Sequence, residues 1–183
     1  MPDDQLVLHC APTLAGIKTG NLFSYFFDDK ECLIREIQQV NKVLVPKGLC
    51  LLPLQLLEGR ALLYLYRPKY LKRDLSGQEA GEILREFGYE EKSLGKCLRR
   101  LVNRLYKNEG FPHEIGLFLS YPPEDVRGFI ENKADSCKLV GYWKVYGDER
   151  KARCLFNKYR KCTELYCKAR NEGAKLKELA VAV

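Results

Sequence analysis

Two apolar runs, residues 49–56 and 61–66, lie on either side of a Glu58-Gly59 pair. Apolar runs of this length around a glycine-containing turn predict a β-hairpin. Pro53 lies inside the first run and has no backbone N–H to donate, so we expect its strand to lie at a sheet edge or to carry a bulge. The chain must therefore build a sheet, and other segments must cover it.

Two segments near this hairpin show the three- and four-residue apolar spacing of amphipathic helices. The first begins at the capping box Asp28-Asp29-Lys30-Glu31 and must end before Pro46. The second begins at the capping box Ser76-Gly77-Gln78-Glu79 and ends at Gly88. Their apolar stripes are Leu33, Ile37, Val40 and Leu44 in the first, and Ala80, Ile83, Leu84 and Phe87 in the second.

Two further helices are predicted over residues 92–107 and, after a Gly147-Asp148 cap, over 149–172. The chain beyond Gly173 is expected to fray. The apolar stripes are Leu94, Cys97, Leu98, Leu101 and Leu105 in the first helix, and Ala152, Leu155, Phe156, Tyr159, Cys162, Tyr166 and Ala169 in the second.

The short apolar run Leu6-Val7-Leu8 predicts a strand over 5–9, and alternating apolar residues predict one over 113–119. A further strand is predicted over 139–146. A short helix is expected from Pro122-Pro123, because proline is tolerated in the first turn of a helix. Segment 113–146 then becomes a β-α-β unit with parallel strands and a right-handed crossover. The sum is one mixed α/β domain over residues 1–183, with about five strands and helices packed on the sheet.

The composition fits such a domain. The chain has 183 residues, of which 46% are apolar and 30% charged, enough for one sizeable core. Its longest apolar stretch, 49–57, is too short to cross a bilayer. The N-terminus is acidic and leads into no long apolar segment, so we expect no secretory signal and a cytoplasmic location. In the cytoplasm the eight cysteines are expected to be reduced. None of them lies in a C-x-x-C pair, so we expect no structural zinc site.

The formal net charge is +7, and the cations gather in the helices predicted at 92–107 and 149–172. A basic surface attracts nucleic acid, phosphorylated metabolites or an acidic partner protein. An ordinary solvated helix face is the simpler interpretation and the favoured one. The candidate surface residues are Arg99, Arg100, Arg104, Lys158, Arg160 and Lys161.

Aromatic rings alternate with cations in two runs, a pattern that suits stacking on single-stranded bases. On a strand every second side chain points into the core, so half of each run is expected to be packing. No RNA-binding signature accompanies either run. The first contains Tyr64, Tyr66, Arg67, Lys69, Tyr70 and Lys72, and the second contains Tyr142, Trp143, Lys144 and Tyr146.

Cys10 and the two histidines, His9 and His113, are the residues best suited to covalent chemistry. A strand that ends at residue 9 and a helix that opens at Pro12 would place Cys10 at a helix N-terminus, where the thiolate is favoured. His113 could then act as its base, with Glu114 or Asn21 orienting the ring. Core packing of Cys10 and hydrogen-bonded histidines at strand ends is the simpler and favoured alternative, and a metal or haem site is a third.

Lys18-Thr19-Gly20-Asn21 can offer backbone N–H groups and a counter-charge to a phosphate or carboxylate, although an ordinary Asn-Gly type turn is favoured. We expect one pocket, lined by segments 9–21 and 111–123. Its expected ligand contacts are His9, Thr13, Lys18, Asn21, Ser120 and Tyr121.

Three segments carry a family resemblance: HCAPTLAGIK at 9–18, FPHEIGLFLSYPPEDV at 111–126 and GYWKVYGD at 141–148. With them the chain resembles the domain of unknown function 3793 family, uncharacterised bacterial proteins found mainly in anaerobes. The likeness covers nearly the whole chain and implies no activity, substrate or cofactor. The family pattern commonly has glycine where this chain has Ser120.

Three functions remain open. The leading expectation is a pocket that binds an anionic small molecule, with or without converting it; in a conversion Cys10 is the reactive group and His113 the proton acceptor. The rival is a non-enzymatic module whose basic helices dock on nucleic acid or an acidic protein. A redox or iron-related role is the third, with iron, haem or flavin as the group bound.

Overall fold

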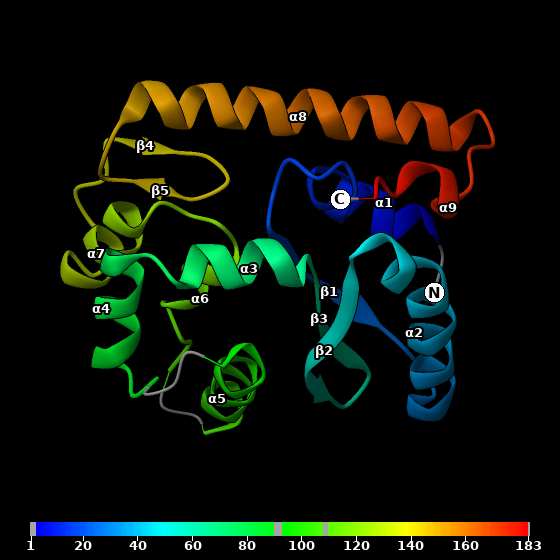
Figure 1. The fold of residues 1–183 in the computed structure, drawn as a ribbon, viewed down its shortest axis with the longest axis horizontal. Helices are drawn as coiled ribbons and strands as arrows, with labels where there is room; N and C mark the ends of the chain where they lie inside the picture. Colours follow the sequence, from blue (N-terminus) through cyan, green and yellow to red (C-terminus); the bar gives the residue numbers. More distant parts are fainter. Residues whose placement is uncertain (1–2, 90–92, 108–109, 183) are drawn as a thin grey trace. The chain divides into compact units, whose positions relative to one another are not determined.

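A computed structural model describes residues 3–89, 93–107 and 110–182 (Figure 1). Its contacts divide the chain into two compact units: unit 1 comprises Met1–Lys69 and Tyr159–Val183, and unit 2 comprises Tyr70–Lys158. Helices and short antiparallel sheets make up both units, so the mixed α/β class is confirmed. The single domain remains a prediction, and each unit is described by itself.

The sheet of unit 1 has three antiparallel strands in the order β1-β3-β2. They are β1 (Gly20–Phe26), β2 (Cys50–Leu57) and β3 (Arg60–Tyr66). The predicted hairpin is β2–β3, with Gly59 at a positive φ of 67° in its turn. Both expectations for Pro53 are met, because β2 lies at an edge and its register shifts between Pro53 and Gln55.

One face of this sheet carries the core of unit 1. The helix α2 (Lys30–Leu44) packs on β2, and α1 (Asp3–Leu14) packs on β1. A short 3-10 helix, η1 (Val45–Lys47), ends α2 at the predicted proline. Asp29 rather than Asp28 caps α2, since its carboxylate accepts the Glu31 N–H. The strand side chains that face these helices alternate, as in a half-buried sheet: Phe23, Leu51, Ala61, Leu63 and Leu65.

The predicted strand at 5–9 is wrong, because these residues lie inside α1. The buried residues Leu6, Val7, Cys10 and Leu14 repeat at the spacing of a helix rather than of a strand. Asp3 and Asp4 occupy the first turn, where their carboxylates interact favourably with the positive end of the helix dipole. Pro12 therefore lies near the end of this helix instead of opening another.

The prediction of a frayed C-terminus is also wrong for residues 174–180. Gly173, with a φ of 99°, ends the long helix, and α9 (Leu176–Leu179) follows. Leu176, Leu179 and Ala180 are buried in the core of unit 1. α9 contacts α1 and α2 there, so the chain end completes the hydrophobic cluster.

Unit 2 is mostly helical, with α4 (Gln78–Glu86), α5 (Leu94–Tyr106) and α7 (Pro123–Glu131) as its main elements. α3 (Pro68–Leu75) leads into it, and the long α8 (Glu149–Asn171) leaves it. Gly88 ends the α4 region with a φ of 74°, as predicted. Lys92, at the start of the predicted 92–107 helix, lies outside the described residues. The predicted stripes of α4 and α5 are buried at Ala80, Ile83, Leu84, Cys97, Leu98, Leu101 and Leu105.

The predicted β-α-β unit is absent from the described part of segment 113–146. Residues 115–118 form the short helix α6, because every residue from Ile115 to Leu119 is buried and the expected two-sided alternation is lost. β4 (Leu139–Val140) and β5 (Lys144–Val145) form an antiparallel pair. Buried Asp125 holds this pair, since its carboxylate accepts the Trp143 indole N–H and the backbone N–H groups of Tyr146 and Gly147, each at 2.7 Å.

Candidate functional site

Cys10 has an environment opposite to that of a reactive thiol. Its side chain is fully buried in the core of unit 1, between apolar residues of α1, α2 and the sheet. Burial raises the pKa of the Cys10 thiol far above its usual range, and the neighbouring Lys18 charge only partly opposes this effect. A nucleophilic thiol needs exposure and a lowered pKa. We therefore do not retain Cys10 as a nucleophile; the alternative of core packing describes its position.

Three predicted ligand residues lie in unit 1, where Thr13 and Lys18 are buried and Asn21 is half-buried. The Thr13 hydroxyl donates to the Asn21 side-chain oxygen at 2.7 Å. Lys18 is 4% exposed, with its ammonium 5.8 Å from the centre of the Tyr159 ring. Burial lowers the pKa of Lys18 to about 8, and the neighbouring Cys10 opposes the shift. This cluster stabilises the α1–β1 connection rather than offering an open phosphate turn.

Replacing Lys18 by methionine is expected to raise the free energy of unfolding at pH 7 by about 3 kcal/mol, because the wild type must bury a charged amine. Between about pH 8 and 10.5 the unfolded chain keeps the Lys18 proton while the folded chain loses it. Wild-type stability should therefore rise through this window, and the advantage of the variant should disappear near its upper end. Denaturant unfolding of both proteins across the window measures the difference.

The raised pKa of Cys10 acts in the opposite direction above its ordinary value of 9.0, because the unfolded thiol then ionises more readily than the folded one. Cys10 is present in both proteins, so its effect cancels in the difference between them. A stability difference that stays constant with pH would contradict the assignment to Lys18.

The two histidines lie in different units. In unit 1, exposed His9 stacks on the Phe23 ring with centroids 5.3 Å apart. In unit 2, exposed His113 meets the edge of the Phe129 ring at 4.9 Å. Both contacts are ordinary aromatic packing. A pocket shared by segments 9–21 and 111–123 stays a prediction.

Glu114 and Arg104, predicted for separate sites, form one buried ion pair in unit 2. The Tyr89 hydroxyl donates to the same Glu114 carboxylate at 3.0 Å. Burial and the Glu114 charge raise the pKa of Tyr89, so this hydroxyl stays protonated and continues to donate. Glu114 is 0% exposed, so its role is to neutralise Arg104 and hold Tyr89 rather than to orient a catalytic histidine.

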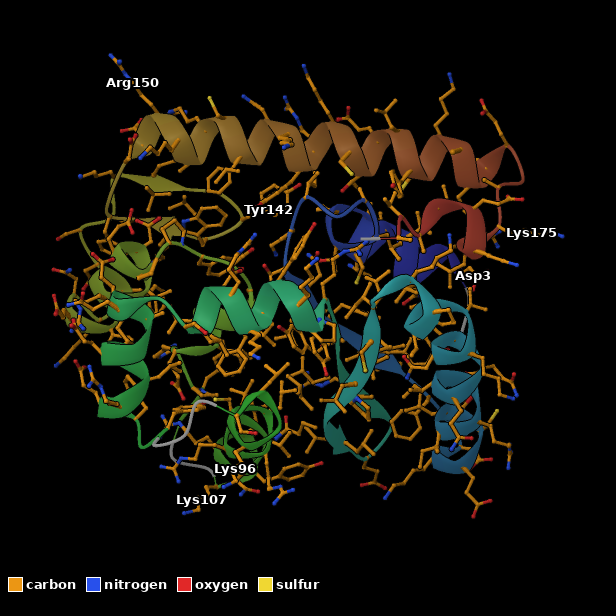
Figure 2. The ribbon with its side chains drawn as sticks, in the orientation of Figure 1. Asp3, Lys96, Lys107, Tyr142, Arg150 and Lys175 are labelled. Carbon is orange, nitrogen blue, oxygen red and sulfur yellow. The ribbon has the colours of Figure 1, made fainter. Side chains whose placement is uncertain are left out.

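The predicted basic surface on α5 is largely used inside unit 2. Arg104 pairs with Glu114, and the Arg100 guanidinium donates twice to the Phe87 carbonyl. Arg99 remains exposed, as do Lys96 and Lys107, which Figure 2 labels. The prediction that α5 presents a row of surface cations is therefore wrong for Arg100 and Arg104, because their guanidinium groups satisfy buried oxygen atoms.

α8 carries cations along its exposed side, and Figure 2 shows Arg150 projecting from it. Several cations are paired locally, including Arg153 with Glu149 and Arg160 with Glu164. Arg150, Lys158 and Lys161 form no ion pair with another described residue. Docking of nucleic acid or an acidic protein thus stays a prediction that rests mainly on α8.

The remaining predicted contacts serve the packing of unit 2. Ser120 has a φ of 58°, a left-handed conformation that glycine adopts with less strain, and this explains the glycine expected there. Its hydroxyl donates to the Leu119 carbonyl at 2.7 Å. The Tyr121 ring stacks on Trp143 at 4.8 Å, and its hydroxyl donates to the Tyr142 carbonyl. These interactions leave Ser120 and Tyr121 as turn and packing residues.

The aromatic runs are mainly interior. Tyr64, Tyr66 and Arg67 are buried in unit 1, with the two rings stacked at 4.9 Å. In unit 2, Trp143 is buried whereas Tyr142 is 43% exposed, as expected for alternating side chains. In the first run, Lys69 and Lys72 are exposed and Tyr70 is half-buried, so stacking of bases on this run stays a prediction for Tyr70 alone.

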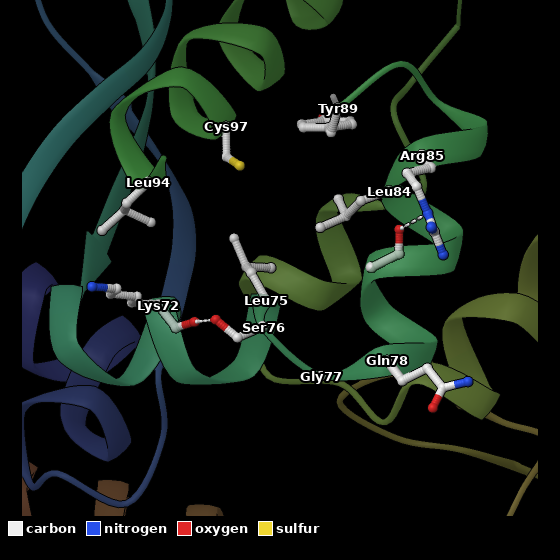
Figure 3. Close-up of a pocket in the computed structure, with 11 residues that line it drawn as sticks. Lys72, Leu75, Ser76, Gly77, Gln78, Leu84, Arg85, Tyr89, Leu94 and Cys97 are labelled. Carbon is white, nitrogen blue, oxygen red and sulfur yellow. Dashed lines mark hydrogen bonds between the residues drawn. The ribbon is translucent and has the colours of Figure 1, made fainter. Parts of the chain in front are cut away.

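Unit 2 contains a pocket that the sequence did not indicate (Figure 3). Its volume is about 390 Å³, within the range of small-molecule sites. α3, α4 and α5 supply its walls, and the Tyr89 ring adds a further side. The lining residues are Lys72, Leu75, Ser76, Gly77, Gln78, Gly81, Leu84, Arg85, Tyr89, Leu94 and Cys97.

The lining combines an apolar middle with cationic sides. Leu75, Leu84 and Leu94 point toward the hollow from three directions (Figure 3). Among the residues that the structure describes, Lys72 and Arg85 are the charged members of the lining, and none of the described members is a carboxylate. Such a pocket can hold an apolar group while attracting negative charge.

Gly81 gives the pocket part of its width. It lies in the middle of α4, where glycine is about 1 kcal/mol less favourable than alanine. A Cβ added at Gly81 would meet no heavy atom within 4 Å, so open space lies beside it. A larger side chain at this position would fill the hollow without disturbing the backbone.

Comparison with protein families matches residues 6–180 to the model described as protein of unknown function, DUF3793. The chain belongs to the DUF3793 family. A search of curated proteins found no match, and a search of solved structures found none either. Membership therefore confirms the resemblance, while the function has to be argued from the site.

This DUF3793 chain shows no metal-binding cluster of His, Cys, Asp and Glu in its described ranges. Among the described helices, none has both the length and the apolar character needed to span a membrane. The redox or iron-related role stays a prediction.

Sequence reasoning missed the pocket of this DUF3793 chain because its lining comes from three helices and a turn. One local signal pointed there: Gly81 interrupts a helical pattern without ending it, which often marks a packing or functional requirement. The capping box predicted at Ser76 is not formed by its hydroxyl. Its hydroxyl in fact donates to the Lys72 carbonyl, and Gly77 is the N-cap of α4.

Proposed function

We propose that this protein binds a small amphipathic anion in the pocket of unit 2. The observation that carries the proposal is the cavity of about 390 Å³ whose middle is lined by leucines and whose charged lining residues, among those the structure describes, are both cations. A pocket with these properties favours ligands that combine an apolar body with negative charge. The ligand class agrees with the expectation from the sequence, but the residues that bind it are different.

The surroundings support an anion. Two acidic side chains of α4 have partners, since Glu86 pairs with Arg127 and Glu82 accepts from Gln78, and Glu79 in the first turn does not line the pocket. The N-terminus of α4 also faces the pocket at Gly77 and Gln78, and no side chain caps it. The positive end of this helix adds to the attraction from Lys72 and Arg85.

Gly81→Leu is expected to weaken binding of 8-anilinonaphthalene-1-sulfonate at least tenfold, because leucine would occupy the hollow. This fluorescent probe is itself an amphipathic anion, and its titration reports the affinity directly. The same substitution should raise the free energy of unfolding by about 0.5–1 kcal/mol, since leucine is a better helix former than glycine. Loss of binding would then not be a consequence of unfolding.

Gly95→Leu is the matched control. Gly95 lies in α5, is exposed, and also has no heavy atom within 4 Å of an added Cβ. It does not line the pocket, so this variant should bind the probe like the wild type. Equal probe affinity in wild type and Gly81→Leu would rule the pocket out as the binding site.

A cytoplasmic location forms part of the proposal. All eight cysteines stand as free thiols, which is the expected state in a reducing compartment.

A further inference from the structure

The geometry points to a dianion with an apolar middle, an α,ω-dicarboxylate or a molecule of similar charge layout, as the ligand of this pocket. The inference rests on the proposed function and specifies its ligand class. It starts from the placement of the two lining cations, whose side chains Figure 3 shows on opposite sides of the hollow, with the Lys72 ammonium at the outer end of its side chain. Lys72 projects from α3, and Arg85 projects from the last turn of α4.

Neither lining cation is paired with a carboxylate of the residues that the structure describes. Lys72 is exposed and forms no ion pair with any residue that the structure describes. Arg85 donates its Nε–H to the Gly81 carbonyl at 3.2 Å, which anchors the guanidinium beside the pocket. Its terminal N–H groups form no hydrogen bond within the described ranges, and a guanidinium fork matches a carboxylate in geometry.

The space between the cations is suited to methylene groups rather than to a charge. Leu75, Leu84 and Leu94 line it, together with the Tyr89 ring and the Cys97 thiol. An anionic group in this middle would lose its hydration without a partner, which is costly. The charges of a ligand are therefore best placed at its two ends.

A ligand with a single carboxylate would leave one of the two cations without a partner. A second carboxylate at the far end would add one partly exposed charge contact, which in comparable sites contributes up to about 1 kcal/mol, or roughly fivefold in affinity. Without a second cation in reach, the extra charge would instead weaken binding, because it must be desolvated. Tighter binding of the dicarboxylate than of the monocarboxylate therefore indicates that a second cation lies within reach of the ligand, and weaker binding indicates that none does.

Octanoate and octanedioate test this inference, because they share a chain length and differ in one carboxylate. Their affinities are measured by displacement of 8-anilinonaphthalene-1-sulfonate from the full chain at low salt. We expect octanedioate to bind about fivefold more tightly than octanoate. Lys72→Met and Arg85→Met should each remove this preference. In at least one of the two variants, octanoate should lose less affinity than octanedioate loses.

Arg99→Met is the control for net charge, since Arg99 is an exposed cation of α5 that does not line the pocket. It should keep the preference for octanedioate. Octanoate binding as tightly as octanedioate, or displacement of the probe by neither, would overturn the dianion inference. The proposed function fails separately, by unchanged probe binding in Gly81→Leu.

Discussion

Arg67→Met is expected to lower the free energy of unfolding by about 3–5 kcal/mol. The guanidinium of Arg67 is fully buried and donates to the carbonyl groups of Thr13, Leu14 and Val181, each at 2.8 Å. Methionine fills a similar volume but donates nothing, so these carbonyl groups would lose their partner. Each unsatisfied buried acceptor costs roughly 1–3 kcal/mol, reduced where water can reach it.

The same three contacts explain why the effect should be large. Arg67 follows β3, while its acceptors lie at the end of α1 and beyond α9. The positive charge also lies at the C-terminus of α1, where it complements the helix dipole. One side chain thus ties the sheet, the first helix and the chain end of unit 1 together.

Denaturant unfolding of the wild type and Arg67→Met measures this loss. Arg73→Met is the matched control, because Arg73 is 69% exposed, pairs with its neighbour Asp74 and lies over the Tyr70 ring at 5.0 Å. An exposed pair of this kind contributes about 0.5 kcal/mol or less. A loss below about 1 kcal/mol for Arg67→Met would show that the buried guanidinium is not a structural tie.

Glu114→Gln is expected to lower the free energy of unfolding by about 3 kcal/mol, because it leaves the Arg104 charge without its buried partner. Glutamine keeps the size of the side chain, so the effect isolates the charge. The Tyr89 hydroxyl would also lose its charged acceptor. Because the Tyr89 ring lines the pocket, affinity for the anionic probe should change as well.

A double substitution tests whether the stability loss comes from leaving one charge of the Arg104–Glu114 ion pair without its partner. Replacing a buried ion pair by two apolar residues is often neutral or stabilising, whereas removing one partner is not. Arg104→Met combined with Glu114→Met should therefore restore most of the stability that Glu114→Gln loses. Equal losses in the single and the double variant, measured by denaturant unfolding, would show that charge pairing is not the cause.

Local signals were sufficient for the central part of the fold. The hairpin of β2 and β3 follows from two apolar runs and Gly59, and the edge position of β2 follows from the missing N–H of Pro53. α2 and α4 follow from their stripes and from the breaks at Pro46 and Gly88. In each case the residues that define the element lie within it.

The strand predictions over 5–9 and 113–119 are wrong because short apolar segments fit either secondary structure. In α1 the decision came from residues further along, since Cys10 and Leu14 extend the helical stripe of Leu6. In α6 burial on all sides removed the alternation on which the strand assignment rested. Tertiary packing outweighed local preference in both segments.

In the candidate site, too, some features follow from local sequence and others only from tertiary packing. Proximity of Thr13 and Asn21 could be expected, because they lie on either side of one short connection, at the end of α1 and the start of β1. The burial of Cys10 could not, since it depends on α2 and the sheet closing over α1. The pocket was also hidden, because Lys72, Gly81 and Tyr89 are brought to one hollow only when three helices pack.

By itself the sequence determined the hairpin, the amphipathic helices, their breaks and the basic balance of the chain, all of which depend on residues within one element. Only the tertiary structure decided which polar groups are enclosed. It paired Arg104 with Glu114, enclosed Arg67 among carbonyl groups, and left Lys72 and Arg85 beside an open hollow. Burial and charge pairing depend on neighbours distant in the chain, and no local pattern specifies them.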